Sequence, residues 1–545
     1  MHAIKRAAGC GIAGSALTSA ICRLADQIPF LMTLLLDALD RTLLEPQCAR
    51  RWHGLAAAWV DTADPAARRS VLEVLRNMPD GDPRADILRL TFIGQASGNA
   101  QFENDACARV LALRPDDPDR LASFMAFQWL SALQHLEGRA AFVAALSASR
   151  VPEMAMRLMQ IATASLPPEL TPRATQDIRR VAVVVPYVGN RFHTPSVMAV
   201  EQCAVLAREG IQVRLFSAQE LLPPDASMFR GDGRELSLPP LNAQAWARFL
   251  PAGMRMTISD KRLSLPGRWR KLMPDLVAFD PDVVLLIGLY SPLAAALFGV
   301  RPVVAVSVNS VPPIAPADVW LTADTAADPT AVWGDGFAPP QPVHHPWRVK
   351  RSREQWPVTR AQLGVGEAAV VWVTAGFRLE HEIKPAWAQR MLALMAGRPE
   401  VTWLVIGGEG KPPAALGGAA ADCVRVLPTR GDLAGILRIA DIYVNPPRMG
   451  GGHSVAEAMA EGMAVVSLAG SDGGDKVGDL ALPDLDAYLE RLAALTANPD
   501  LRRETGQALR RRFDERYDLD ASGPALLAAC RQAADLARAR LTAPS

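Results

Sequence analysis

Three consecutive glycines, Gly450, Gly451 and Gly452, stand directly before a segment with the pattern of a helix. Glycine lets the backbone approach a ligand closely, and a helix N-terminus offers free N–H groups and a partial positive charge to a phosphate. Ser454 adds a hydroxyl donor, and Glu457 follows one turn later on the same side, where it could accept hydrogen bonds from a ribose diol. A glycine-rich turn before an ordinary helix explains the glycines alone, whereas a nucleotide diphosphate explains all three features.

A histidine follows the first predicted strand of the chain's α/β region, within residues 189–196. The carboxyl ends of strands in open α/β folds are where ligands bind, so His193 should face a cleft. Its intrinsic pKa near neutrality suits removal of a proton from an acceptor hydroxyl, which makes His193 the candidate general base of an inverting mechanism. His193 could instead only donate to a backbone carbonyl, and Ser196 could be a helix N-cap.

A second acidic segment, Asp472-Gly-Gly-Asp475-Lys476, is predicted to end a later strand at the same edge. Asp472 or Asp475 could hold the hydroxyls of a donor sugar, with Lys476 beside them as part of the donor site. A plain turn explains the Asp-Gly-Gly sequence nearly as well. Four further histidines are cleft-side candidates whose roles stay open: His344, His345, His381 and His453.

The elements that must position these residues fall into three parts, as the length of 545 residues suggests. Residues 1–175 show helix after helix, with apolar residues at three- and four-residue spacing. The turn at residues 114–118 resembles the turn between tetratricopeptide-like repeats, although the rest of that repeat signature is missing. We therefore predict an all-α domain, in which the apolar stripes form either a core or a partner-binding groove.

After residue 180 the pattern changes to apolar runs of the kind that a parallel sheet buries on both faces. Strands and helices then alternate, which predicts a Rossmann-like domain over 176–340. A proline-rich stretch at 337–346 is the predicted linker, and the alternation restarts after it. Residues 341–545 should form a second Rossmann-like domain with C-terminal helices. Two such α/β domains in tandem place a ligand cleft between their carboxyl edges.

Residues 370–480 resemble the C-terminal nucleotide-sugar-binding domain of GT-B glycosyltransferases. WLVIGGEG (403–410) is similar to their strand ending in Gly-acidic-Gly, and LPTRGDLAGILRIADIYVNPP (427–447) to their helix–strand entry to the donor site. GGGHSVAEAMAEGMAVV (450–466) resembles their donor-binding loop and helix. The resemblance implies that Glu457 binds the ribose, and that the glycines and Ser454 contact the phosphates.

The same resemblance implies that Arg378 and Lys384 neutralise the donor diphosphate as the glycosidic bond breaks, without a metal ion. Taken alone, either side chain could be a solvated surface charge. One position departs from a family pattern. Retaining enzymes with a pair of glutamates eight positions apart would carry the earlier one at Met449, so that mechanism class is not supported.

We therefore expect a hexosyltransferase-type enzyme that moves a sugar from a nucleotide-diphosphate sugar to an acceptor hydroxyl or amide, with no cofactor and no metal. Helical repeats fused to this fold resemble protein-glycosylating enzymes, which implies an adhesin or flagellin polypeptide as acceptor. A saccharide or a lipid-linked acceptor stays open. Two alternatives are a nucleotide-sugar epimerase of the same fold and a catalytically degenerate scaffold protein. The turn after the first α/β strand lacks GxGxxG, which disfavours a dinucleotide-dependent dehydrogenase.

Composition excludes further classes of protein. Lysine and arginine number 58 against 57 aspartates and glutamates, so we expect no nucleic-acid partner. Seven widely spaced cysteines indicate neither a disulfide framework nor a zinc site, and the cytoplasm is the simplest compartment.

Two segments raise the question of a membrane. The apolar run 283–300 is broken by Gly288 and Pro292, as in a buried α/β unit, so no transmembrane helix is predicted. Residues 254–273 carry six basic residues against one acidic residue around Trp269. This segment could contact the inner face of a membrane, a phosphorylated acceptor or a partner, or it could be a solvated helix–loop face.

Overall fold

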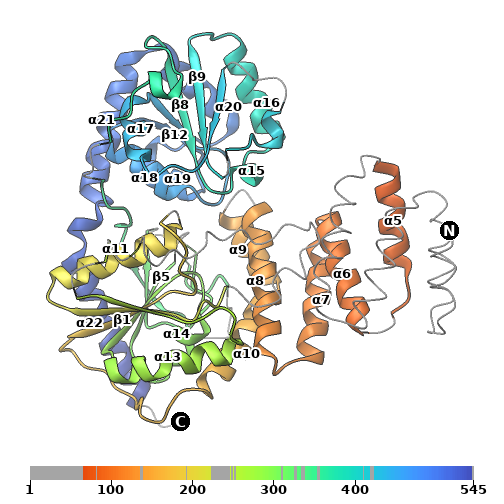
Figure 1. The fold of residues 1–545 in the computed structure, drawn as a ribbon, viewed down its shortest axis with the longest axis vertical. Helices are drawn as coiled ribbons and strands as arrows, with labels where there is room; N and C mark the ends of the chain where they lie inside the picture. The colour runs from red at the N-terminus through yellow and green to blue at the C-terminus, as the bar shows by residue number, and fades with distance from the viewer. Residues whose placement is uncertain are drawn as a thin grey trace.

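The computed structural model shows an all-α domain followed by two α/β domains that face one another (Figure 1). This arrangement confirms the predicted fold class. Residues 1–64 of the predicted helical domain lie outside the described residues. The structure describes residues 65–542 except for the gaps 81–82, 136–138, 192, 222–245, 247–248, 251–252, 308–310, 324–327, 333–337, 353–355, 409 and 418–422.

The described part of the all-α domain consists of consecutive helices: α5 (Pro65–Asn77), α6 (Pro83–Ser97), α7 (Ala100–Leu113), α8 (Pro118–His135), α9 (Arg139–Ala148) and α10 (Val151–Thr163). The turn at residues 114–118 separates α7 from α8, and Pro118 starts α8, where its missing N–H costs no hydrogen bond. Helix α10 packs on α8 and on α14 of the first α/β domain, so the two domains share one hydrophobic core.

The first α/β domain is built on a seven-stranded parallel sheet of order β3-β2-β1-β4-β5-β6-β7. Its strands are β1 (Arg180–Val184), β2 (Gln212–Ser217), β3 (Arg255–Ile258), β4 (Val283–Ile287), β5 (Val303–Val306), β6 (Val319–Thr322) and β7 (Gln341–His344), and its helices are α11 (Thr194–Arg208), α13 (Leu265–Phe279) and α14 (Pro292–Leu297). Successive residues of a strand face opposite sides, so Val181 and Val183 pack beneath α11, whereas Ala182 and Val184 belong to the core that contains α13 and α14.

The second α/β domain has a five-stranded parallel sheet of order β10-β9-β8-β11-β12. Its strands are β8 (Val370–Ala375), β9 (Val401–Ile406), β10 (Val424–Leu427), β11 (Ile442–Val444) and β12 (Ala464–Val466), and its helices are α15 (Leu379–Glu382), α16 (Pro385–Ala396), α17 (Leu433–Ile439), α18 (Gly452–Ala460), α19 (Asp472–Val477), α20 (Leu485–Ala497) and α21 (Pro499–Arg516). Helices α17, α18 and α21 cover one face, and α16 and α20 cover the other.

Two segments beyond residue 340 belong to the first α/β domain rather than to the second. Strand β7 lies within the proline-rich stretch that was predicted to be a linker, because an edge strand tolerates Pro342 and its missing N–H. The last helix, α22 (Gly523–Thr542), returns to the first domain and packs beside α11, with Ala529, Ala533 and Ala534 buried. The chain therefore crosses between the two α/β domains twice (Figure 1).

Candidate active site

The glycine-rich loop joins β11 to the N-terminus of α18 on the side of the second domain that faces the first (Figure 1). Gly451 is the N-cap residue with φ +91°, a left-handed conformation that residues with a Cβ rarely adopt. Gly452 lies so close to Asp472 that a Cβ at this position would be 2.9 Å from the Asp472 Cβ. The glycines are thus required by the path of the chain, and the N–H groups at the start of α18 are left for a ligand.

An arginine that the sequence analysis did not single out lies directly beneath this loop. The side chain of Arg448 is only 3% exposed. It donates from Nε to Asn445 Oδ1 at 2.9 Å and from Nη2 to the Ala375 carbonyl oxygen at 3.1 Å. A Cβ on Gly451 would overlap its guanidinium. The loop therefore wraps around a fixed positive charge.

Arg448 shares a carboxylate with Arg378, the arginine predicted to bind the leaving group. Glu382 accepts from Arg448 Nη1 through Oε2 at 2.8 Å and from Arg378 Nη2 through Oε1 at 2.8 Å. Burial disfavours ionisation of Glu382, but the two guanidinium groups outweigh it and lower the pKa of Glu382 to about 2. Two cations thus share one anion, and a Cβ on Gly450 would be 3.0 Å from Arg378 Nη2. The cluster keeps a net positive charge beside the glycines.

The other predicted residues of this region occupy different places. The Ser454 hydroxyl lies 2.7 Å from the Tyr443 hydroxyl and donates to the Gly451 carbonyl at 3.1 Å, so it holds the turn. Lys384 is the half-buried N-cap residue of α16. His453 Nε2 lies 3.7 Å from Glu457 Oε1, and burial raises the pKa of Glu457 while the charge of His453 opposes the rise.

Glu201 of α11, in the first domain, lies near enough to Glu457 of the second domain for their charges to interact. Burial and the charge of Glu457 raise the pKa of Glu201 to about 8, although the charge and backbone N–H of Lys350 oppose the rise. One oxygen of Glu201, Oε2, is buried without a hydrogen-bond partner among the described residues. The charge of Glu457 on α18 therefore acts on Glu201 of α11 across the domain interface, a proximity with no signal in the sequence.

His193 lies at the start of the same helix, as its N-cap residue, so the interpretation of Ser196 as the N-cap is wrong. Its Nδ1 is 2.6 Å from the Ser196 hydroxyl, which also accepts from the Gly189 N–H at 3.0 Å. Burial and the charge of Arg378 lower the pKa of His193 to about 3, so the imidazole is neutral near pH 7. The structure thus brings His193 of the first domain near Arg378 of the second.

The segment Asp472–Lys476 begins α19 rather than lying in an open turn, with Ser471 as the capping residue. Asp472 Oδ1 is buried and has no hydrogen-bond partner in the described ranges, and burial raises the pKa of Asp472 to about 7. Burial, together with the charge of Arg348, lowers the pKa of Lys476 to about 8. Asp475 instead pairs with a side chain of the helical domain.

That side chain is Arg139, the first residue of α9. Its Nη2 lies 2.8 Å from Asp475 Oδ1, and its backbone N–H donates to the Gly470 carbonyl at 3.2 Å. Helix α8 contacts α15, and Asp119 of α8 accepts from the Leu265 N–H of α13 at 2.7 Å. The helical domain therefore touches both α/β domains and closes one side of the interface between them (Figure 1).

Comparison with known proteins supports the predicted fold and class of enzyme. Residues 370–498 match the family model described as "Glycosyl transferases group 1". The chain is a glycosyltransferase with the GT-B fold. No curated protein matches the sequence.

Among solved structures, a point mutant of the Thermobaculum terrenum O-GlcNAc transferase has a similar fold, with 16% sequence identity and a TM-score of 0.55. That alignment covers 97% of this chain and 100% of the other. WaaG, a glycosyltransferase involved in lipopolysaccharide biosynthesis, aligns at 14% identity and a TM-score of 0.42 over 64% of this chain and 98% of its own.

The remaining histidines of the glycosyltransferase have varied surroundings. His345 is buried, its Nδ1 lies 3.0 Å from Arg348 Nη1, and burial lowers the pKa of His345 to about 3. His344 lies exposed on the edge strand β7. His381 Nε2 lies 3.0 Å from Glu380 Oε1 on α15.

The basic segment 254–273 of the glycosyltransferase is partly internal. Arg268 and Trp269 are fully buried on α13. Arg268 donates to the Leu263 and Gln219 carbonyls, and Trp269 Nε1 donates to Glu220 Oε1 at 2.9 Å. Trp269 is therefore inside the first domain and offers no exposed aromatic anchor, whereas the other basic residues of the segment are exposed: Arg255, Lys261, Arg262, Arg270 and Lys271.

Within the described ranges, no group of three or more histidine, cysteine, aspartate or glutamate side chains is arranged to hold a metal ion. No helix in the same part of the chain is both long and apolar enough to cross a membrane.

Proposed function

We propose that this glycosyltransferase uses a nucleotide-diphosphate sugar whose diphosphate lies over the N-terminus of α18. One observation carries the proposal: the guanidinium groups of Arg378 and Arg448 converge on Gly450 and Gly451 and share the single carboxylate of Glu382. An anion at this point would meet one unbalanced charge and the free N–H groups of a helix.

The two arginines would act differently on the donor. Arg378 is one-third exposed, so it can contact the diphosphate directly and balance the charge that develops as the glycosidic bond breaks. Arg448 is buried, so it would act on the diphosphate indirectly, by supporting the glycine-rich loop and through the electrostatic field of its positive charge. This charge supports transfer without a metal ion. Glu457 would accept hydrogen bonds from the ribose, on the side of α18 that faces α11.

His193 is proposed as the general base. The neutral imidazole can take the proton of the acceptor hydroxyl through Nε2. This requires that Nδ1–H donates to Ser196 Oγ, while the Ser196 hydroxyl donates to the Tyr187 carbonyl at 3.4 Å. A low pKa makes His193 a weak base in the empty site, and the negative charge of a bound donor would raise it. The product would have inverted configuration.

The helical domain supports a polypeptide or glycan as acceptor, because α8 and α9 border the domain interface at which the charge of Arg378 acts on His193. An acceptor entering there would contact the helical domain as well as both α/β domains. Lipid-linked saccharides remain a further class of acceptor for the same site.

The test is a thermal-shift screen of the full chain with UDP, GDP, dTDP, CMP and their sugars, with EDTA present. A donor that binds only the folded protein must raise the melting temperature. Glu457→Ala should lose most of this rise, whereas Glu490→Ala, at an exposed position of α20, should keep it. Equal shifts in both variants would remove Glu457 from the donor site.

Turnover assays then separate the alternatives. His193→Ala should bind the donor normally and transfer sugar slowly, and normal transfer would eliminate the base assignment. Product formed from the donor alone would indicate an epimerase. Donor binding with no turnover towards any polypeptide or glycan would indicate a degenerate scaffold protein.

A further inference from the structure

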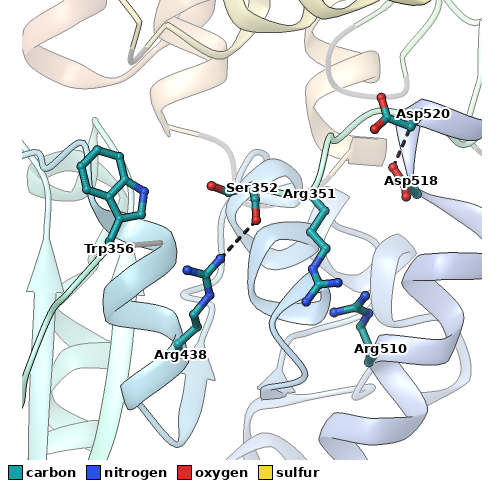
Figure 2. Close-up of a pocket in the computed structure, with 7 residues that line it drawn as sticks. All are labelled: Arg351, Ser352, Trp356, Arg438, Arg510, Asp518 and Asp520. Atoms are coloured by element: carbon teal, nitrogen blue, oxygen red, sulfur yellow. Dashed lines mark hydrogen bonds between the residues drawn. The ribbon is translucent and has the colours of Figure 1, made fainter. Parts of the chain in front are cut away.

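A cavity of about 760 Å³ lies where the two chain crossings between the α/β domains run side by side. The outgoing crossing and the returning one are joined by a bridge between Val349 and Asp518, and the Leu519 N–H donates to the Val349 carbonyl at 3.0 Å. The cavity has the volume of a small-molecule site. Its walls are Arg351, Ser352, Trp356, Arg438, Arg510, Asp518 and Asp520 (Figure 2).

We call this cavity, which lies beside the two chain crossings, the hinge pocket. It is separate from the glycine-rich loop. Arg510 Nη1 donates to the Ala460 carbonyl, and Arg438 Nε donates to Glu461 Oε2 at 2.8 Å, so both arginines lie at the C-terminal end of α18. The loop is at the other end of that helix, and nine residues of α-helix span about 13 Å. A ligand on the loop would therefore not fill the hinge pocket.

The three arginines of the hinge pocket are not equally neutralised. Arg438 pairs with both oxygens of Glu461, which is 5% exposed. Arg510 pairs with Asp514 through Nε, at 2.8 Å. Arg351 makes no ion pair or hydrogen bond in the described part of the chain, and its guanidinium points toward that of Arg510 (Figure 2). Two like charges aimed at one another favour an anion between them.

The acidic residues of the pocket do not supply that anion. Asp520 Oδ1 lies 2.9 Å from Arg208 Nη2 of α11, and Asp518 Oδ1 accepts from the Asp520 N–H at 3.1 Å. Both stand on the returning crossing, away from the two facing guanidinium groups (Figure 2). Trp356 forms a further wall, with its Cβ packed against Gly435 of α17.

We propose that the hinge pocket binds a small phosphate-bearing molecule between Arg351 and Arg510. Its phosphate would join the outgoing crossing, which carries Arg351, to α21, which carries Arg510. Because these crossings are where the α/β domains can move relative to one another, occupancy would restrict that movement. The proposal concerns a second site and does not depend on the function proposed for the first.

Inorganic pyrophosphate is the probe, measured by calorimetry on the full chain in 150 mM salt. The same titration of Arg378→Ala, which removes the partly exposed cation beside the glycine-rich loop, identifies any binding that belongs to that loop. We expect one binding event that Arg378→Ala leaves unchanged, and Arg351→Ala should weaken it about tenfold or more, because a charge-assisted hydrogen bond contributes about 1.5–3 kcal/mol. Arg351→Ala breaks no ion pair or hydrogen bond to a described residue, so this variant should fold and keep its basal activity.

Arg503→Ala is the matched control, because it removes an exposed arginine from the same helix as Arg510. Pyrophosphate should bind this control as it binds the unaltered chain, and should slow amide exchange at 349–352 and 518–520. Absence of binding by the unaltered chain, or equal affinity of Arg351→Ala and Arg503→Ala, would overturn the proposal.

Discussion

Replacement of Gly451 by alanine should destabilise the chain in two ways, by straining the backbone and by displacing Arg448. Replacement of Gly462, at the other end of α18, should strain the backbone only, so the two variants separate these contributions. Gly451 and Gly462 flank the helix and both have positive φ, +91° and +77°. A Cβ on Gly462 meets no described atom within 4 Å, whereas one on Gly451 overlaps the Arg448 guanidinium. Gly462→Ala therefore bears only the left-handed backbone cost, roughly 1–2 kcal/mol.

Gly451→Ala bears that cost and must also displace Arg448. For a domain of this size, 1 kcal/mol corresponds to roughly 2–4 °C, so Gly462→Ala should melt about 2–8 °C lower than the unaltered chain. Moving Arg448 would break charge-assisted hydrogen bonds to Glu382 and Asn445, worth about 1.5–3 kcal/mol each. Gly451→Ala should therefore be less stable still, and should bind the donor nucleotide at least about tenfold more weakly.

The assay is thermal melting of both variants with and without the nucleotide that shifts the unaltered chain. Gly462→Ala should keep the full ligand-induced rise from its lower starting point, and Gly451→Ala should lose most of it. Equal ligand-induced rises in the two variants would refute the view that the diphosphate lies on this loop above Arg448.

Two further predictions concern the domain interfaces. The folded-state pKa of Glu201 is raised to about 8, so the folded chain holds a proton that the unfolded chain releases above about pH 4.5, and stability should fall as pH rises through this window. Melting of Glu201→Gln at pH 5, 7 and 9 should show a smaller fall than the unaltered chain, and a pH-independent difference between the two would contradict the assignment. Arg139→Ala should cost about 1–3 kcal/mol, because it strands Asp475, whereas Arg150→Ala, which breaks the exposed pair with Glu153, should cost under about 0.5 kcal/mol. Equal melting temperatures for the two arginine variants would show that the helical domain is not held by the Asp475 pair.

The sequence was a good guide to elements whose signal is local. The apolar run 283–300, interpreted as a buried α/β unit broken at Gly288 and Pro292, forms strand β4 (Val283–Ile287) and helix α14 (Pro292–Leu297), because the glycine and the proline divide it locally. The sequence of the edge strand β7 has no such apolar run, because most of its side chains are exposed, and its proline suggested a linker. Arg268 and Trp269 have the residue types of an exposed contact surface, yet both are buried. Their burial depends on carbonyls and a carboxylate elsewhere in the fold, which the local sequence does not show.

The candidate site shows the same division. The glycines before α18 could be found because a helix start and its backbone freedom are local properties. Arg448 stands next to that motif, yet its role depends on Glu382, which is 66 residues away in the chain. The effect of the Glu457 charge on Glu201 likewise depends on how the two domains meet. Periodicity and spacing carry no information about contacts of this kind.

Helix α22 has a consequence for how the polypeptide matures. The first sheet is translated early, but one of its faces is completed by residues 523–542, with Arg540 paired to the buried Asp318. Until that helix leaves the ribosome, the apolar face beside α11 stays open to water and to other chains. The second domain can finish folding before the first does. A released chain truncated after residue 522 should therefore hold a formed second domain and an aggregation-prone first one.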